Sequence, residues 1–271
     1  MSMELGLKGR TAVITGGSKG IGRAIAKALA AEGVNLVLVA RGKEQLDQTA
    51  DRLRQGTGVK VLAVSADITK ADQVDAAATA AKEAFGTVNI VINNAGGPMR
   101  RMDRQILWPD SDWISDLDNK ILGALRVTRA FLPLIPSDGS GRIINISGTA
   151  STIVWAPALT HALNNAAMNQ ATGYLAQDLA GQNITVNTVV PGLVGTEGRE
   201  VWAENMAKQQ NVTQAEFVAS FCKRMGILAG RWATMDEVAD TVVFVASDRA
   251  RYFNGAKIIL DGGLNVNVRP A

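Results

Sequence analysis

The sequence predicts an α/β fold, a single Rossmann-type, doubly wound parallel sheet of about seven strands with helices on both faces. Short runs rich in β-branched residues alternate with longer segments that have helical spacing and alanine-rich faces, which is the pattern of βαβ units. The short runs are almost continuously apolar, as in LVLVA at 36–40 and VNIVIN at 88–93. Such runs are typical of strands that helices cover on both sides.

Seven segments have the length and composition of strands, and helical spacing is clearest in three longer segments. The expected strands are Thr11–Thr15, Val34–Ala40, Val59–Ser65, Val88–Asn93, Gly141–Ser147, Thr185–Val190 and Lys257–Leu260. The expected helices include Ile21–Glu32, Ala71–Phe85 and Ala162–Leu179. No linker, repeat or low-complexity tract interrupts the alternation, so we expect residues 1–271 to form one domain.

The segment from Gly192 to Thr234 departs from this alternation. It is polar and irregular, with aromatic and methionine residues at intervals that suggest short helices. An insertion at the carboxyl end of a strand lies where open α/β sheets bind ligands. We therefore expect residues 192–234 to form a lid over the site, although a surface excursion without a ligand role fits the same pattern. Thr234 and Glu237 form a capping box that begins the next helix.

Composition excludes several classes of protein. The 28 Lys and Arg residues and 25 Asp and Glu residues give a net charge of only +3 and are scattered, which argues against nucleic-acid binding. Cys222 has no partner for an intrachain disulfide, and the acidic residues at 110–118 have no nearby His or Cys, so no metal site is expected. No apolar run approaches the ~18 residues of a membrane helix, and Met1–Arg10 does not resemble a signal peptide. We expect a soluble, cytoplasmic protein that acts on a small molecule.

A glycine-rich turn follows the first expected strand and opens the first helix. Glycines stand at 16, 20 and 22 of the sequence TGGSKGIG, where the chain must reverse and a phosphate must approach the backbone closely. The free N–H groups of the helix start favour an anion there. The turn therefore predicts a dinucleotide pyrophosphate site, with a tight turn that binds nothing as the alternative. The residues assigned to this site are Gly16, Ser18, Lys19, Gly20, Ile21 and Gly22.

The end of the second expected strand indicates which dinucleotide binds. Binders of an unphosphorylated ribose usually place an acidic residue there, whereas this chain has Arg41. Together with Lys19, Arg41 can pair with a 2′-phosphate through charge-assisted hydrogen bonds. We expect NADP(H) rather than NAD(H). The alternative is that both side chains are simply solvated.

The order of these motifs resembles the short-chain dehydrogenase/reductase family, and most closely its acyl-carrier-protein ketoreductase-like members. The matching residues are the glycine turn, Asp67, the run Asn93–Gly96, Pro191-Gly192, Asn254-Gly255 and Asp261–Gly263. The resemblance implies the strand order 3-2-1-4-5-6-7 and a homo-oligomer, a tetramer or dimer, paired through the helices around Asn119 and Ala166. It also implies cofactor contacts from Asp67, Ile68, Asn93, Ala95, Gly96, Pro191, Gly192 and Thr196.

The catalytic residues of that family are only partly present. Asn119 matches its asparagine, but the serine, tyrosine and lysine positions fall on Gly148, His161 and Asn165. Neither of the two tyrosines has a lysine four residues later. Losing the serine hydroxyl removes a donor to the developing oxyanion, which typically costs ~10²–10³ in rate, unless the hydroxyl of Ser147 or Thr149 takes its place.

His161, the only histidine, occupies the tyrosine position one helical turn before Asn165. An imidazole exchanges protons near neutrality and can act as a general acid or base. We expect His161 to take that role, Asn119 to order water, and Asn165 to bind the cofactor ribose. Alternatively, His161 is a helix-start residue without chemistry.

Three functions remain open. The first is an NADP(H)-dependent oxidoreductase acting on a carbonyl or hydroxyl group. The second is a non-redox enzyme, such as a dehydratase, isomerase or lyase, on the same scaffold. The third is a catalytically silent NADP(H)-binding protein, which an exposed apolar patch around Trp155 would support.

Overall fold

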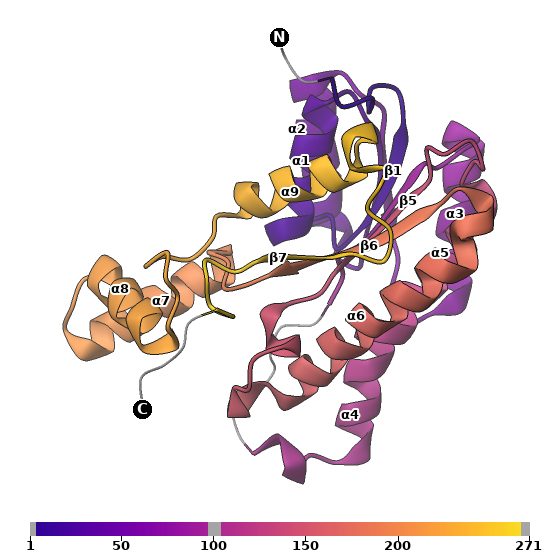
Figure 1. Ribbon diagram of the computed structural model, residues 1–271. Helices are drawn as coiled ribbons and strands as arrows, with labels where there is room; N and C mark the ends of the chain where they lie inside the picture. The colour runs from indigo at the N-terminus through magenta and orange to yellow at the C-terminus, as the bar shows by residue number, and fades with distance from the viewer. Residues whose placement is uncertain (1–3, 97–103, 267–271) are drawn as a thin grey trace.

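The computed structural model describes residues 4–96 and 104–266, and its centre is one parallel sheet (Figure 1). The strands are β1 (Thr11–Thr15), β2 (Asn35–Ala40), β3 (Val61–Ser65), β4 (Ile90–Asn93), β5 (Arg142–Ile146), β6 (Thr185–Pro191) and β7 (Lys257–Leu260). Their order is β3-β2-β1-β4-β5-β6-β7, and every pairing is parallel. The predicted fold class and strand order are confirmed.

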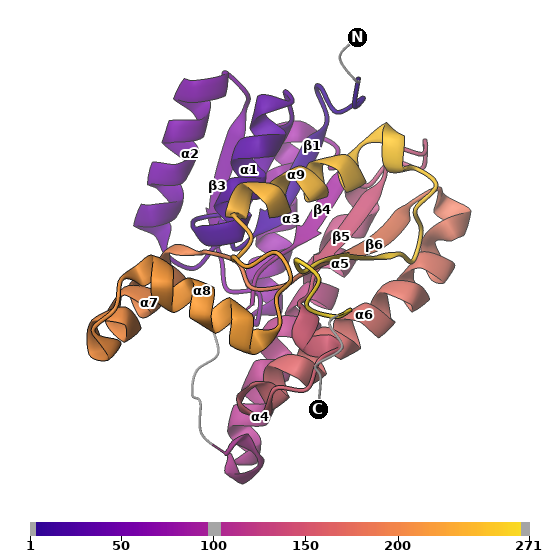
Figure 2. The same ribbon diagram turned by 60° about the vertical axis from the view of Figure 1, so that its left-hand side comes forward.

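Helices cover both faces of this sheet, as Figures 1 and 2 show. The α-helices of the described residues are α1 (Gly20–Ala31), α2 (Lys43–Thr57), α3 (Ala71–Phe85), α4 (Asp110–Leu117), α5 (Gly123–Phe131), α6 (Leu159–Leu179), α7 (Glu197–Gln210), α8 (Gln214–Met225) and α9 (Met235–Ala246). The side chains of Ala12 and Ile14 enter the core under α1, α2 and α9, whereas Val13 enters the core under α3, α5 and α6. This alternation along β1 explains why the strands read as continuous apolar runs.

The segment between α4 and α5 is not regular α-helix. Residues Asp118–Leu122 form a π-helical turn that joins the two helices. Such turns insert an extra residue into a helix and are frequent at functional sites. This turn changes the direction in which its side chains leave the helix.

The expected lid segment forms two helices, α7 and α8, with a small core of their own. The ring of Trp202 meets those of Phe217 and Phe221 edge to face, with centroids 5.4 and 5.5 Å apart. A bridge between Val194 and Ala233 joins the two ends of the segment. Figure 2 shows α7 and α8 beside the carboxyl end of the sheet. The capping box of Thr234 and Glu237 begins α9 as predicted.

The inner face of α6 is polar, in contrast to a usual amphipathic helix. Asn169 accepts a hydrogen bond from Ser147 Oγ at 2.7 Å, and Thr172 accepts one from Asn145 Nδ2 at 2.9 Å. Asn145 in turn accepts one from Asn93 Nδ2 at 2.9 Å. Since these groups are buried, their hydrogen bonds specify how α6 sits on β5. Within the described residues, no helix has the length and apolar character needed to cross a membrane.

Candidate functional site

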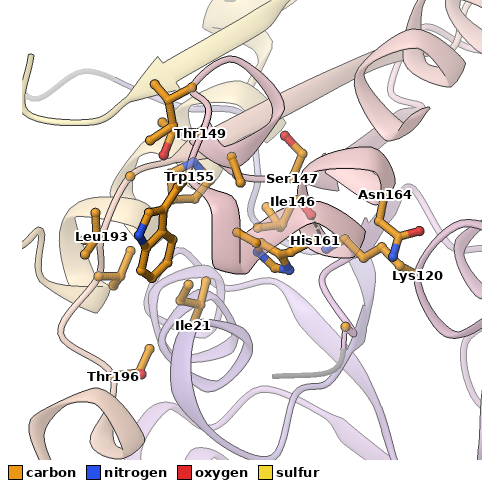
Figure 3. Close-up of a pocket in the computed structure, with 18 of the residues that line it drawn as sticks. Ile21, Lys120, Ile146, Ser147, Thr149, Trp155, His161, Asn164, Leu193 and Thr196 are labelled. Carbon is orange, nitrogen blue, oxygen red and sulfur yellow. Dashed lines mark hydrogen bonds between the residues drawn. The ribbon is translucent and has the colours of Figure 1, made fainter. Parts of the chain in front are cut away.

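A cavity of about 260 Å³ opens at the carboxyl ends of the strands, at the edge where β1 lies between β2 and β4. The strand order reverses there, and open α/β sheets bind ligands at that point. Its walls come from the turn after β1, the ends of β5 and β6, the π-helical turn, and the first turns of α6 and α7. Figure 3 shows the side chains of several of these elements converging on it.

The glycine turn after β1 is built so that its backbone is uncovered. Gly16 and Gly20 have φ values of +68° and +56°, which side-chain-bearing residues rarely adopt. A Cβ atom on Gly22 would lie within clashing distance of the carbonyl oxygen of Gly16 and 2.5 Å from Asn94 Nδ2. The turn therefore needs its glycines, and it leads into the N-terminus of α1, a position that favours an anion.

The other predicted residues of this turn have different surroundings. Ser18 is buried, and its carbonyl accepts a hydrogen bond from Thr49 Oγ1 at 3.0 Å. Lys19 is the exposed N-cap of α1, with its side chain available to a ligand. Ile21 lines the cavity.

The predicted adenosine-side residues lie at the ends of β2 and β3. Arg41 is exposed after β2, and its carbonyl accepts a hydrogen bond from Ser65 Oγ at 3.0 Å. Partial burial raises the pKa of Asp67, but hydrogen bonds from Thr69 and the charges of Arg41 and Lys70 outweigh it and hold that pKa below its usual value. Arg41 and Asp67 are thus close neighbours.

Ile68 is a packing residue. Its side chain is 6% exposed and lies against Gly123 at the start of α5, where a Cβ atom would come within 2.6 Å of Ile68 Cδ1. Because the side chain of Ile68 is used in packing, only its backbone could contact a ligand in this site.

The run Asn93–Gly96, at the end of β4, contains one residue whose side chain faces the core and two residues that face the site. Asn93 is buried and donates to Thr128 Oγ1 at 3.0 Å and to Asn145 Oδ1 at 2.9 Å, so its side chain binds neighbouring elements. Asn94 and Gly96 line the cavity. The backbone N–H groups of Asn94 and Ala95 both donate to Thr15 Oγ1 at 3.0 Å, which ties β4 to β1. Asn94 had not been assigned to the site from the sequence.

The residues after β6 form the opposite wall. Pro191, Gly192 and Thr196 line the cavity. Gly192 donates its N–H to the carbonyl of Leu260 at 2.8 Å, and a Cβ atom on it would lie 2.8 Å from Cα of Asp261. Thr196 is the N-cap of α7, without a side-chain capping bond. Its hydroxyl is therefore available to a ligand.

His161 lies in the first turn of α6 and lines the cavity, as predicted. Its side chain points toward the centre of the view in Figure 3, beside Lys120. Burial lowers the pKa of His161 to about 4, helped by the positive charges of Lys120 and Arg199. At neutral pH the ring is uncharged, with one nitrogen that donates and one that accepts.

Gly148 is a neighbour of that imidazole. A Cβ atom on Gly148 would lie 3.8 Å from His161 Nε2, so the missing serine would have been adjacent to the ring. Ser147 does not replace it, because its hydroxyl donates to Asn169 and points away from His161 (Figure 3). Thr149 lines the cavity, at some distance from His161 in the same view.

Asn165 does not reach the cavity wall. The residue is 0% exposed, and its amide lies behind Gly148. Neither its Oδ1 nor its Nδ2 has a hydrogen-bond partner among the described residues. Asn165 is not among the residues that line the cavity, and its expected bond to a cofactor ribose stays a prediction.

The π-helical turn contributes two adjacent residues to the cavity, Asn119 and Lys120. Asn119 had been assigned from the sequence, but Lys120 had not. Lys120 Nζ donates to the carbonyl oxygen of Ile146, at the end of β5, over 2.6 Å. Burial lowers the pKa of Lys120 to about 8.

Two further lining residues were not assigned to the site from the sequence. Arg199 lies three residues after Thr196, one turn along α7, and its guanidinium carbon is 5.6 Å from the ring centroid of Trp232. Burial lowers its pKa. Trp155 lines the cavity and lies near Ile21 and Leu193 (Figure 3). Trp155 is half-buried, and the neighbouring Val154 is exposed.

Comparison with known proteins gives consistent results. The family model described as enoyl-(acyl carrier protein) reductase matches residues 16–265. The oxidoreductase UcpA of Salmonella typhimurium is 36% identical over 258 residues, covering 95% of each chain. L-Sorbose reductase from Gluconobacter frateurii, solved with NADPH and L-sorbose, has a TM-score of 0.91 and 30% identity, covering 98% of this chain and all of its own.

A second solved structure is similar in a further respect. The NADPH-bound short chain oxidoreductase from Pseudomonas aeruginosa has a TM-score of 0.87 and 27% identity, covering 96% of this chain and 98% of its own. It is described as containing an atypical catalytic center. A departure from the usual catalytic residues is thus found in another protein of this fold.

Proposed function

Because the chain belongs to the short-chain dehydrogenase/reductase family, we propose that it is an NADP(H)-dependent oxidoreductase that interconverts a carbonyl and a hydroxyl group of a small molecule. One observation carries the proposal. A single cavity brings Ile21, Pro191 and Thr196, on its cofactor side, together with His161 and Lys120. Groups that hold a nicotinamide and groups that exchange or donate protons therefore face the same space.

The residues present fit the cofactor. Gly16, Gly20 and Gly22 uncover the backbone before α1, where side chains would block a pyrophosphate. Arg41 and Lys19 are exposed cations at the end of β2 and the start of α1, suited to a 2′-phosphate. Two structural neighbours were solved with NADPH, which supports NADP(H) over NAD(H).

The bound cofactor would supply or accept a hydride at the substrate carbon. His161, uncharged at neutral pH, would donate a hydrogen bond to the substrate oxygen, which replaces the absent serine and tyrosine donors. Asn119, from the π-helical turn, would position water at the same cavity. Asn165, whose two amide atoms have no hydrogen-bond partner among the described residues, would bind the cofactor ribose.

Turnover of a compound panel tests this proposal. Purified protein is expected to oxidise NADPH, followed at 340 nm, with at least one ketone, quinone or enone, and His161→Ala is expected to lower that rate by roughly 10²-fold or more. Tyr174→Phe, on the exposed face of α6, is the matched control and should leave the rate unchanged.

The alternatives give different results in the same experiment. NADPH binding by calorimetry without turnover of any compound would indicate a catalytically silent protein. Substrate conversion at constant 340-nm absorbance would indicate a non-redox enzyme. Either result contradicts the proposal.

We also propose that the chain is a homo-oligomer, a dimer or tetramer. Large apolar side chains are exposed along α4, the π-helical turn, α5 and α6, among them Leu117, Leu122, Leu125 and Leu163. Such a patch on a water-exposed surface favours association. Light scattering of the wild type and of Leu125→Glu tests this, since the charge should shift the mass toward a smaller species.

A further inference from the structure

We propose that Lys120 is the proton donor of this site, with its ammonium group in contact with the substrate oxygen. This assignment rests on the proposed function, because it names the group that completes that reaction. The tyrosine that donates the proton in the resembled family is absent here. His161, whose imidazole is neutral at pH 7, stands in its place.

The position of Lys120 is set by two backbone elements. Its Nζ donates to the carbonyl oxygen of Ile146 at 2.6 Å and lies 3.2 Å from the place of a Cβ atom on Gly96. The ammonium group therefore sits between the carboxyl ends of β5 and β4. Figure 3 shows it next to His161, at the same cavity.

The ammonium group has hydrogen-bonding capacity to spare. It carries three N–H donors, of which the Ile146 carbonyl takes one. No ion pair found among the described residues includes Lys120, whereas Asp118, two residues earlier, pairs with Arg126 at 2.6 Å. Two donors thus remain for a substrate oxygen and its surroundings.

The charged and titratable groups that face Lys120 favour this division of roles. His161 of α6 lies beside Lys120 (Figure 3), and the charge of Lys120 helps to lower the pKa of His161, while Arg199 of α7 and Asp116 of α4 line the same cavity. With a pKa of about 4, the His161 ring is neutral at pH 7, and its remaining N–H donates a hydrogen bond but is too weak an acid to release a proton. Burial brings the pKa of Lys120 to about 8, so it is mostly protonated at pH 7 but much more acidic than an ordinary lysine near 10.4. A donor with a pKa near the working pH is the effective one.

The step balances as follows. A hydride supplied by the bound reduced cofactor would form the new C–H bond at the carbonyl carbon, with a C–H bond of the cofactor broken and the π electrons of the carbonyl passing to its oxygen. One N–H bond of the Lys120 ammonium breaks and an O–H bond forms on the substrate oxygen. The neutral amine then recovers a proton from solvent. In the oxidative direction the amine accepts the proton that the alcohol loses.

Lys120→Met, Lys120→Arg and Lys120→Ala test the assignment, with Lys27→Met, an exposed lysine of α1, as the control. Lys120→Met should lower kcat by roughly 10²–10⁴-fold and change the NADPH Kd by less than about twofold. The limb of the kcat/KM pH profile near pH 8 should disappear. Added methylamine should restore part of the activity of Lys120→Ala. Lys27→Met should behave as wild type.

Lys120→Arg guards against loss of folding, because arginine keeps the charge and can still donate to the Ile146 carbonyl but does not release a proton. It should fold and remain inactive. A readout without substrate is also available. In the unliganded protein, acylation of Lys120 followed by peptide mass spectrometry should be half-maximal near pH 8.

Three results would overturn the assignment. The first is a fall in NADPH affinity that accounts for the whole loss of activity, which would make Lys120 a cofactor ligand. The second is a pH limb that persists in Lys120→Arg. The third is full activity of Lys120→Met, which would remove only this assignment, whereas the absence of turnover in the wild type would remove the proposed function itself.

Discussion

The side-chain amide nitrogen of Asn165 lies 3.0 Å from the position that a Cβ atom would occupy on Gly148. Gly148 has a φ of 179°, an extended conformation that any residue adopts, so the backbone does not require glycine there. It is the side-chain amide of Asn165 that restricts this position to glycine. Asn165 is fully buried and has little room to move away from a larger residue at 148. Two of the departures from the family's catalytic residues are therefore physically coupled.

This coupling predicts the outcome of restoring the serine. Gly148→Ser should lower the free energy of unfolding by about 1–3 kcal/mol, since it overpacks a filled site. In the Asn165→Ala background the same change should cost at least 0.5 kcal/mol less. Urea denaturation of the two single variants and the double variant measures the coupling. If the changes in unfolding free energy are additive, the Asn165 side chain can move away from residue 148 without a loss of stability.

The buried imidazole predicts how stability depends on pH. Its pKa falls from 6.5 to about 4 on folding, so between these values the unfolded chain binds a proton that the folded chain does not. Stability is therefore lost as pH falls from 6.5 to 4, by about 2–3 kcal/mol from this group. The difference in unfolding free energy between wild type and His161→Gln should change by that amount over this range. A constant difference would contradict the burial of a neutral ring.

The exposed cation after β2 predicts cofactor preference. Arg41→Ala should weaken NADPH binding by about tenfold or more, because a charge-assisted hydrogen bond contributes about 1.5–3 kcal/mol, while NADH binding should change little. Calorimetry with both cofactors measures this. Arg52→Ala, an exposed arginine of α2, is the control. Equal losses for NADPH and NADH would show that Arg41 does not recognise the 2′-phosphate.

The start of the lid predicts a competition at the phosphate turn. Glu197 of α7 pairs with Arg23 of α1, and its Oε2 lies 3.9 Å from the place of a Cβ atom on Gly20. A carboxylate there disfavours a nearby pyrophosphate. Glu197→Gln should therefore tighten NADPH binding several-fold at low ionic strength, with a smaller gain at high salt.

Glu204→Gln, further along α7 and paired with Lys208, is the control for that experiment and should leave the affinity unchanged. Weaker binding by Glu197→Gln would instead mean that the Arg23–Glu197 pair closes over the bound cofactor.

Local patterns predicted the architecture because they depend on neighbours in the chain. The apolar runs, the glycine turn and the capping box at Thr234 are each formed by residues close together in the chain, and each pattern is typical of one backbone conformation. The parallel sheet, the helices on its two faces and the capping box at Thr234 follow from them and are confirmed. His161 lines the cavity, and it had been singled out by the family resemblance, as the residue at the tyrosine position.

The chemistry inside the cavity was decided by tertiary structure. A π-helical turn has no sequence periodicity of its own, so the direction of Lys120 toward β5 could not be read from the chain. Asn93 and Asn165 look like ligand-binding amides in the sequence, but packing directs one to Thr128 and Asn145 and buries the other behind Gly148. The sequence predicted where a dinucleotide would lie. Which polar side chains face it depends on distances between segments far apart in the chain, and these exist only once the elements pack.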